Sequence, residues 1–270
     1  MEPVGAGEFD GHPYLRVGDG TGRPLVVVMG LNDPLARVTD SLAYATLVGA
    51  FGLRLRRRGY PGPVYLTSRP VGLPRDHTTR EMAADLVEAL APLGRVNLLG
   101  LSMGGFVCQH LAVDTPHRVE RLVLGLAAAR LSEAGRRRVR CWQEHAERGE
   151  WARIYRAGAE AVATGWTRHG LRLAATLFAG WVGPPPAAVD FDVSARACLA
   201  HDATDRLADI AAPTLVLGGT EDPFFGESEY RTTVAGLPDA RRVRFDGVGH
   251  EAVLERARAF DRAVVGHLRA

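Results

Sequence analysis

The sequence predicts an α/β protein with a doubly wound, mostly parallel sheet and an inserted α-helical segment. Short apolar runs alternate with amphipathic helical patterns towards both ends of the chain, which is typical of a parallel sheet covered by helices. Between about residues 131 and 209 only helical patterns occur. A serine, an aspartate and a histidine each follow an expected strand, which places them at the carboxyl edge of that sheet.

Composition restricts the class of protein further. The 270 residues, 46% of them hydrophobic, are enough for one large domain with an insertion. The formal net charge of +2 provides no strong field for nucleic acid or a membrane surface, and no apolar stretch reaches the roughly 18 residues that cross a bilayer. The first residues lack a basic region followed by an apolar run, so we expect a cytoplasmic protein. As partner we expect a small-molecule substrate, with no nucleic acid and no membrane, bound by a monomer or homodimer.

Short runs rich in leucine and β-branched residues, bounded by turn residues, are expected to be strands. They cover residues 14–17, 24–30, 64–66, 96–99, 121–126, 213–218 and 242–245. Between them we expect helices with apolar residues on one side. These cover about 41–58, 78–93, 106–114, 226–236 and 252–269.

Two of these helices carry local signals. Thr78 followed by Glu81 forms a capping box, and Gly94 marks the end of that helix. In the helix over 41–58, apolar side chains predict the buried side. They are Leu42, Leu47, Phe51 and Leu55.

The middle of the chain breaks the alternation of strands and helices. Helical patterns follow one another there without a strand, over 132–147, 150–165, 167–181 and 192–208. We interpret residues 131–209 as a helical cap inserted over the sheet, and residues 1–130 and 210–270 as the α/β core.

A Gly-x-Ser-x-Gly motif, Gly100 to Gly104, separates the strand at 96–99 from the next helix. A serine at such a sharp turn holds its hydroxyl clear of the sheet, while the glycines leave room for the backbones to pass. The helix that follows directs its N-terminal amides towards Ser102, where negative charge would develop during acyl transfer. The motif in this context predicts a nucleophile.

A serine nucleophile needs a base, and the base needs a carboxylate that orients it. His250 follows the strand at 242–245, and Asp222 follows the strand at 213–218. Glu221 is the alternative carboxylate, but the proline after Asp222 and the shorter reach of aspartate favour Asp222. The other histidines lie on expected helices or turns rather than directly after a strand.

An oxyanion hole requires two backbone N–H groups that converge on one point. Met103, the residue after the expected nucleophile, supplies one from the helix N-terminus. Leu31, in the loop after the first buried strand, is the expected second donor.

Together these residues resemble the α/β-hydrolase fold family. The resemblance rests on the strand ending at Gly30, the elbow at Ser102, the run 213–218 with Asp222, and Gly249-His250. It implies an α/β-hydrolase fold with the cap between the sixth and seventh strands. By the same resemblance, Ser102, Asp222 and His250 would form the catalytic triad, and the N–H groups of Leu31 and Met103 the oxyanion hole.

Two positions depart from the family pattern. Met29 stands where the family usually has histidine, and Thr67 stands where it usually has aspartate, although Arg69 and Gly72 of the same motif are present. These changes are expected to alter the support of the loop near the oxyanion hole rather than the chemistry.

Aromatic residues of the cap and of the loop after Asp222 are candidates for an apolar substrate pocket, although packing between helices would explain them equally well. They are Trp142, Trp166, Phe178, Trp181 and Phe224. The sequence thus predicts a serine hydrolase that cleaves a small, apolar carboxylic ester or thioester through an acyl-enzyme.

Other functions remain open on the same residues. A carbon–carbon bond hydrolase, a lyase or a cofactor-free perhydrolase would use the same triad, and a non-catalytic ligand receptor could share the fold. No cofactor and no metal are expected, because the sequence has no H-E-x-x-H motif, no Walker loop and no Rossmann glycine pattern.

Overall fold

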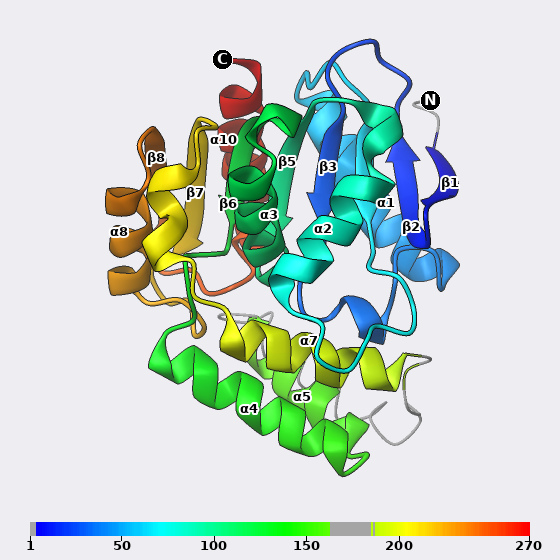
Figure 1. Ribbon diagram of the computed structural model, residues 1–270, viewed down its shortest axis with the longest axis vertical. Helices are drawn as coiled ribbons and strands as arrows, with labels where there is room; N and C mark the ends of the chain where they lie inside the picture. Colours follow the sequence, from blue (N-terminus) through cyan, green and yellow to red (C-terminus); the bar gives the residue numbers. More distant parts are fainter. Residues whose placement is uncertain (1–3, 163–184, 186) are drawn as a thin grey trace.

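The computed structural model describes residues 4–162, 185 and 187–270, with a mixed sheet through the centre (Figure 1). The sheet has eight strands in the order β1-β2-β4-β3-β5-β6-β7-β8. The strands are β1 Val4–Phe9, β2 His12–Val17, β3 Leu25–Val28, β4 Val64–Thr67, β5 Val96–Leu101, β6 Val119–Gly125, β7 Thr214–Gly219 and β8 Ala240–Phe245. The pairs β1–β2 and β2–β4 are antiparallel, and all pairs from β4 across to β8 are parallel. The predicted fold class is confirmed.

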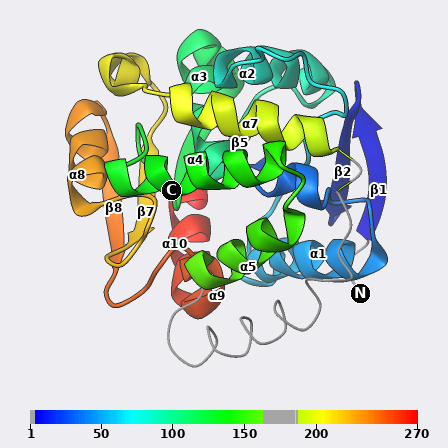
Figure 2. The same cartoon turned by 90° about the horizontal axis from the view of Figure 1, so that it is seen from below.

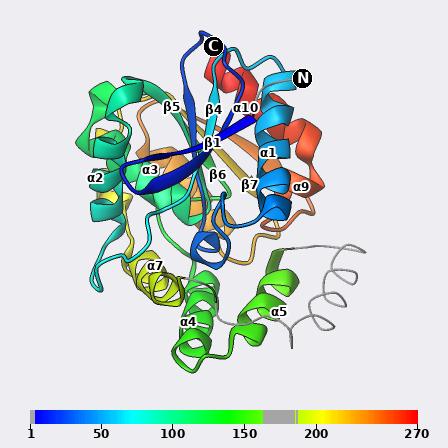
Figure 3. The same ribbon diagram turned by 90° about the vertical axis from the view of Figure 1, so that its right-hand side faces the viewer.

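Helices lie on both faces of the sheet and in a separate layer beyond it. Those of the described residues are α1 Leu42–Arg57, α2 Thr79–Ala89, α3 Met103–Asp114, α4 Glu133–Glu147, α5 Trp151–Val162, α7 Ala188–Ala200, α8 Glu227–Gly236, α9 Ala252–Glu255 and α10 Ala257–Arg269. Helices α1, α9 and α10 lie on one face, and α2 and α3 on the other (Figure 3). None of the helices in the described ranges is both long and apolar enough to cross a membrane.

The central strands are buried on both sides because neighbouring residues point to opposite faces. Val26 and Leu98 belong to the core beneath α2 and α3, whereas Val27 and Leu99 belong to the core beneath α1 and α10. All four side chains have no exposed surface. Two hydrophobic cores therefore fix the sheet, and with it the edge where the parallel strands end.

Helices α4, α5 and α7 form a separate layer beyond the carboxyl ends of the parallel strands (Figure 1). Within it, α4 and α7 lie side by side (Figure 2). The layer is tied to the sheet region by Asp190 of α7, whose carboxylate accepts the backbone N–H of Leu73 at 2.9 Å. The division into core and cap stays a prediction, and the helix expected over 167–181 lies outside the described residues.

The expected buried side of α1 was partly wrong. Leu42 and Leu47 are 85% and 58% exposed, while Phe51 and Leu55 are buried as predicted. Gly52 explains the difference, because its missing side chain brings α1 so close to β2 and β4 that a Cβ there would lie 2.9 Å from a methyl of Val17. This close approach sets which side of the helix faces the sheet.

Other boundaries differ locally. The N-terminal strand β1 was not predicted, and α3 begins at Met103 rather than at Phe106. The helix expected over 192–208 ends at Ala200, because Asp202 accepts the N–H of Thr204 at 2.9 Å and starts a 3-10 helix, η5 Thr204–Asp209.

The C-terminal helix is divided, whereas one predicted capping box is confirmed. The helix expected over 252–269 is split into α9 and α10 at Arg256, whose φ of −123° is not helical. At the start of α2, the Thr78 hydroxyl accepts the N–H of Glu81 at 3.2 Å, and the Glu81 carboxylate accepts the N–H of Thr78 at 2.8 Å.

Candidate active site

Ser102 lies at the turn between β5 and α3. Its backbone has φ 54° and ψ −123°, a conformation that side chains rarely adopt. Its N–H donates to the carbonyl oxygen of Gly125 on β6 at 2.9 Å, which holds the turn against the sheet. A Cβ at Gly104 would lie 2.8 Å from the carbonyl oxygen of Met29, so only glycine lets α3 start this close to β3. The turn leaves the serine side chain half-buried at the carboxyl edge.

His250 and Asp222 reach Ser102 from the loops after β8 and β7. Nδ1 of His250 lies 2.8 Å from Oδ2 of Asp222, and Nε2 lies 2.9 Å from Oγ of Ser102. Because a carboxylate only accepts hydrogen bonds, Nδ1 carries the proton and Nε2 presents its lone pair to the serine hydroxyl. We call this hydrogen-bonded row the candidate triad. Glu221, the alternative carboxylate, is exposed.

Asp222 is held by four donors. Its side chain is 0% exposed. Oδ1 accepts the backbone N–H groups of Phe224 and Phe225 at 2.8 and 3.1 Å. Oδ2 accepts the hydroxyl of Tyr230 at 3.1 Å in addition to Nδ1–H of His250. These bonds stabilise a buried negative charge and fix the orientation of the carboxylate.

Tyr230, on α8, was not identified from the sequence. Its side chain is fully buried, and its ring lies where a Cβ of Gly218 would be, so the glycine at the end of β7 makes room for it. Burial, followed by the charge of Asp222, raises the pKa of Tyr230 well above its ordinary value, so its hydroxyl stays a hydrogen-bond donor. A single aromatic residue in a polar helix was the only sequence signal, and it does not reveal its partner.

Burial and the neighbouring negative charges shift the pKa of His250 in opposite directions. Burial by itself lowers its pKa, but the charge and hydrogen bond of Asp222, together with the charge of Glu251, outweigh it and leave the pKa raised. The raised pKa makes the imidazole of His250 a stronger base than an isolated histidine. The pKa of the neighbouring Glu251 is itself raised to about 7 by burial.

The two nominated oxyanion donors lie next to Ser102. A Cβ at Gly30 would be 3.2 Å from Cβ of Ser102, so the loop that carries the Leu31 N–H passes directly beside the serine. Met103 is the first residue of α3, so its N–H has no partner inside the helix. The assignment of these two N–H groups to an oxyanion hole stays a prediction.

The two departures from the family pattern have visible consequences. Thr67 donates from its hydroxyl to the carbonyl oxygen of Val27 at 3.1 Å, so it is bound to the neighbouring strand and supplies no charge. Met29 is half-buried after β3. A carboxylate that meets Arg69 comes instead from Asp33, on the loop that follows Leu31.

Aromatic rings connect the candidate triad to α4. The ring of Phe224 lies 4.7 Å from that of His250, and the indole of Trp142 lies 5.3 Å from Phe224. Phe225 packs on the same imidazole at 5.9 Å. The other nominated pocket residues lie outside the described residues; they are Trp166, Phe178 and Trp181.

The described residues show no arrangement of three or more histidine, cysteine, aspartate or glutamate side chains that could hold a metal ion. The cysteines are unpaired, with Cys108 and Cys198 buried and Cys141 exposed.

The parallel sheet, the strained serine between a strand and a helix, and the histidine and carboxylate on later loops together define a protein of the α/β-hydrolase class. A family model described as the alpha/beta hydrolase fold matches residues 65–257. The chain belongs to the α/β hydrolase fold family.

Similar proteins agree with this family at the level of the fold. The structure of an α/β hydrolase enzyme from a Medee basin deep-sea metagenome library is 18% identical, with a TM-score of 0.76 over 96% of this chain and 94% of that one. A hydrolase from Pseudomonas aeruginosa PA01 is 24% identical, with a TM-score of 0.75 over 99% of this chain and 98% of that one.

A curated relative has a higher sequence identity, but only over a short segment. The 2-hydroxy-6-oxononadienedioate/2-hydroxy-6-oxononatrienedioate hydrolase of Cupriavidus pinatubonensis is 42% identical over 67 residues. The match spans 25% of this chain and only 23% of that protein.

Proposed function

We propose that the chain is a serine hydrolase that cleaves a small, apolar carboxylic ester or thioester. The observation that supports this most directly is the hydrogen-bonded row from Asp222 through His250 to Ser102, at 2.8 and 2.9 Å. Oγ of Ser102 attacks the substrate carbonyl while Nε2 of His250 takes its proton. Asp222 keeps the imidazole in the required tautomer and stabilises its positive charge.

The remaining steps use the same groups. The N–H groups of Leu31 and Met103 stabilise the negative oxygen of the tetrahedral intermediate. His250 returns its proton to the leaving alcohol or thiol, which leaves the acyl group on Ser102. Water then attacks the acyl-enzyme, with His250 as base, and releases the acid.

The surroundings of His250 support an apolar substrate. Phe224 and Phe225, both buried, pack against its ring, and the half-buried Trp142 of α4 packs on Phe224. Aromatic side chains stabilise an apolar group by burying it rather than by binding a charge. In this proposal the layer of α4, α5 and α7 acts as the cap that completes the pocket.

A second candidate function is hydrolysis of a carbon–carbon bond beside a ketone. The relative from Cupriavidus, 42% identical over 67 residues, is named a 2-hydroxy-6-oxononadienedioate/2-hydroxy-6-oxononatrienedioate hydrolase. The triad could serve such a reaction as well. The aromatic contacts around His250 favour the ester over a doubly charged substrate.

The experiment is a comparison of the wild type with Ser102→Ala. The wild type should react with a fluorophosphonate probe at Ser102 and hydrolyse p-nitrophenyl acetate, butyrate and hexanoate, as well as an acyl thioester. Ser102→Ala should lose labelling and lower kcat by on the order of 10⁶-fold. Its melting temperature, measured in parallel, should remain close to that of the wild type.

Two outcomes would contradict the proposal. Ester turnover that persists in Ser102→Ala would assign the chemistry to another residue. Cleavage of a 2-hydroxy-6-oxo dienoic acid with a far higher kcat/KM than any ester or thioester would favour the second candidate.

A further inference from the structure

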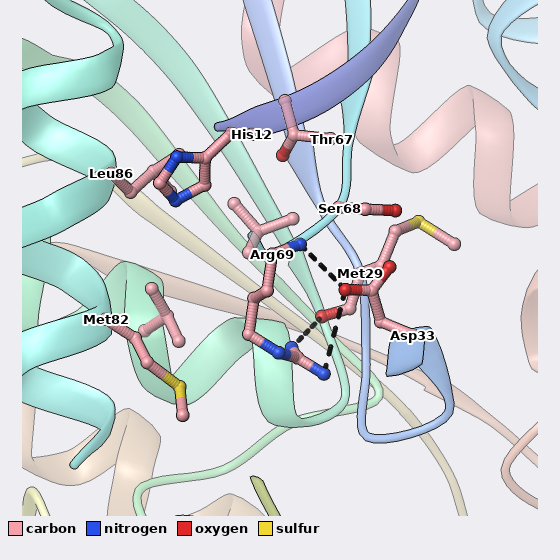
Figure 4. Close-up of a pocket in the computed structure, with 10 residues that line it drawn as sticks. His12, Met29, Asp33, Thr67, Ser68, Arg69, Met82 and Leu86 are labelled. Carbon is pink, nitrogen blue, oxygen red and sulfur yellow. Dashed lines mark hydrogen bonds and ion pairs between the residues drawn. The ribbon is translucent and has the colours of Figure 1, made fainter. Parts of the chain in front are cut away.

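The side chain of Arg69 holds the loop that carries Leu31 by hydrogen bonds to two of its carbonyl groups. Nη2 of Arg69 donates to the carbonyl oxygen of Gly30 at 3.0 Å. Nη1 of Arg69 donates to the carbonyl oxygen of Met29 at 3.3 Å (Figure 4). The Arg69 residue is only 5% exposed, so these bonds are shielded from water. The guanidinium thus fixes two successive carbonyl groups of a loop beside Ser102.

Asp33 holds Arg69 in this position. Its Oδ2 accepts the backbone N–H of Arg69 at 2.8 Å and lies 3.8 Å from Nη2 of the same residue (Figure 4). Asp33 is 1% exposed, so the two opposite charges neutralise each other inside the protein. Burial lowers the pKa of Arg69 and raises that of Asp33, and in each case the partner's charge opposes the shift.

The geometry of one peptide unit links this pair to the reaction. The carbonyl of Gly30 and the N–H of Leu31 belong to the same planar peptide, and the described residues contain no cis peptide bond. In a trans peptide, C=O and N–H point in opposite directions. Because Arg69 holds the carbonyl on its own side, the N–H of Leu31 is directed away from Arg69.

We infer that Asp33 and Arg69 form a positioning pair that aims and polarises the Gly30–Leu31 peptide as the oxyanion donor. The inference rests on the proposed function. A charged donor on the carbonyl polarises the amide, so its N–H becomes a stronger donor to a developing oxyanion. Neither residue touches the substrate, and both act through the backbone of the loop.

The experiment compares Arg69→Met with a matched control, Arg56→Met. Arg56, at the end of α1, also holds two loop carbonyls, donating from Nη1 to those of Tyr60 at 2.8 Å and Gly62 at 3.0 Å. That loop precedes β4, whereas Arg69 follows β4, so the two arginines hold loops at opposite ends of the same strand. A loss caused only by general destabilisation of the fold should be common to both variants.

Three quantities are measured for each variant: kcat and KM for a p-nitrophenyl ester, and the inhibition constant of a trifluoromethyl ketone. The ketone forms an adduct on Ser102 with a negative oxygen, so its affinity reports on the oxyanion hole. Arg69→Met should lower kcat about 10–100-fold with KM changed less than about twofold, and should weaken the ketone by a similar factor. Arg56→Met should leave all three unchanged.

Two further variants decide the matter if Arg69→Met does not fold. Arg69→Lys keeps the charge but not the fork of two donors, and its kcat should fall between those of the wild type and Arg69→Met. The double variant Asp33→Asn with Arg69→Met removes both buried charges and should show the same loss in kcat.

The outcomes separate this inference from the proposed function. An active, labelled wild type combined with an unchanged kcat in the Arg69 variants, or with a loss confined to KM, overturns the inference alone. A wild type that neither reacts with the fluorophosphonate probe nor hydrolyses esters overturns the proposed function, and the inference with it.

Discussion

The protonation state of His250 decides when the candidate triad can work. Only the neutral imidazole accepts a proton from Ser102, and the pKa of His250 is raised because the charges of Asp222 and Glu251 outweigh burial. Below this pKa His250 is protonated and cannot accept the proton of Ser102. We therefore expect kcat/KM to rise as the pH passes the pKa of His250 and to level off above it.

Replacing Glu251 by glutamine should move this rise to lower pH. The ionised Glu251 carboxylate, whose own pKa is about 7, stabilises the imidazolium, so its removal lowers the pKa of His250. The measurement is kcat/KM of an ester between pH 5 and 9. The exposed Glu88→Gln on α2 serves as control. A rise that stays in place or moves to higher pH in Glu251→Gln would contradict the electrostatic account.

Tyr230→Phe should weaken both stability and catalysis. The change keeps the ring but removes one of the donors to the buried Asp222, which should lower the free energy of unfolding by about 1.5–3 kcal/mol. Urea unfolding and kcat are measured together. The control Tyr60→Phe also removes a buried hydroxyl, which donates to the carbonyl oxygen of Arg23 and accepts from the amide of Asn97, far from the triad. Only Tyr230→Phe should lower kcat, and an equal effect in both would assign Tyr230 a purely structural role.

At the scale of elements, α7 shares apolar side chains with the core beneath α2 and α3 and is also bonded to the sheet region by one carboxylate. Asp190 accepts the N–H of Leu73 at 2.9 Å and the N–H of Gly72 at 3.0 Å, in the loop between β4 and α2. Asp190 is 3% exposed, so water cannot readily replace it as acceptor. The contact joins the layer of α4, α5 and α7 to the loop that also carries Arg69.

Asp190→Ala should therefore lower the free energy of unfolding by about 2–4 kcal/mol, because two N–H groups lose a charged acceptor. Asp192→Ala on the same helix is the control. It removes an ion pair with Arg196, which contributes about 0–1 kcal/mol, and one hydrogen bond from Gln143 at 3.1 Å, but no buried backbone N–H loses its acceptor. Urea unfolding of both variants checks the difference, and equal midpoints would show that the Asp190 contact contributes little.

At the scale of the whole molecule, successive ring contacts connect the layer of α4, α5 and α7 to His250 of the candidate triad. Trp142 of α4 packs on Phe224, and Phe224 packs on His250. These rings come from parts of the chain on either side of β7. An acyl chain that lies against them would bury its methylene groups.

If Trp142 lines the pocket, truncating it should weaken the preference for longer esters. Each buried methylene contributes about 0.8 kcal/mol, or about fourfold in kcat/KM. We expect kcat/KM to increase from acetate to hexanoate in the wild type and in Trp142→Phe, but to stay nearly constant in Trp142→Ala. The same chain-length dependence in all three proteins would place Trp142 outside the pocket.

The parts that could be predicted are those controlled by neighbours in the chain. The serine elbow, the capping box at Thr78 and the buried strands follow from glycine spacing, side-chain caps and apolar runs. The exposure of Leu42 and Leu47 could not be predicted, because Gly52 decides how closely α1 approaches the sheet. The role of Tyr230 was also hidden, since its partner Asp222 contacts it only once α8 has packed against β7.

The amino-acid sequence by itself determined the alternation of strands and helices and which residue types end the parallel strands. Those features depend on periodicity and caps that act within a few residues. Tertiary structure decided the distances and orientations at which distant side chains meet, and which further partners such as Asp33 and Tyr230 join them. Asp33 reaches the N–H of Arg69 across 36 residues, Asp190 that of Gly72 across 118, and His250 the hydroxyl of Ser102 across 148. Contacts at such separations form because the packed sheet brings its loops to one edge, where distance along the chain no longer matters.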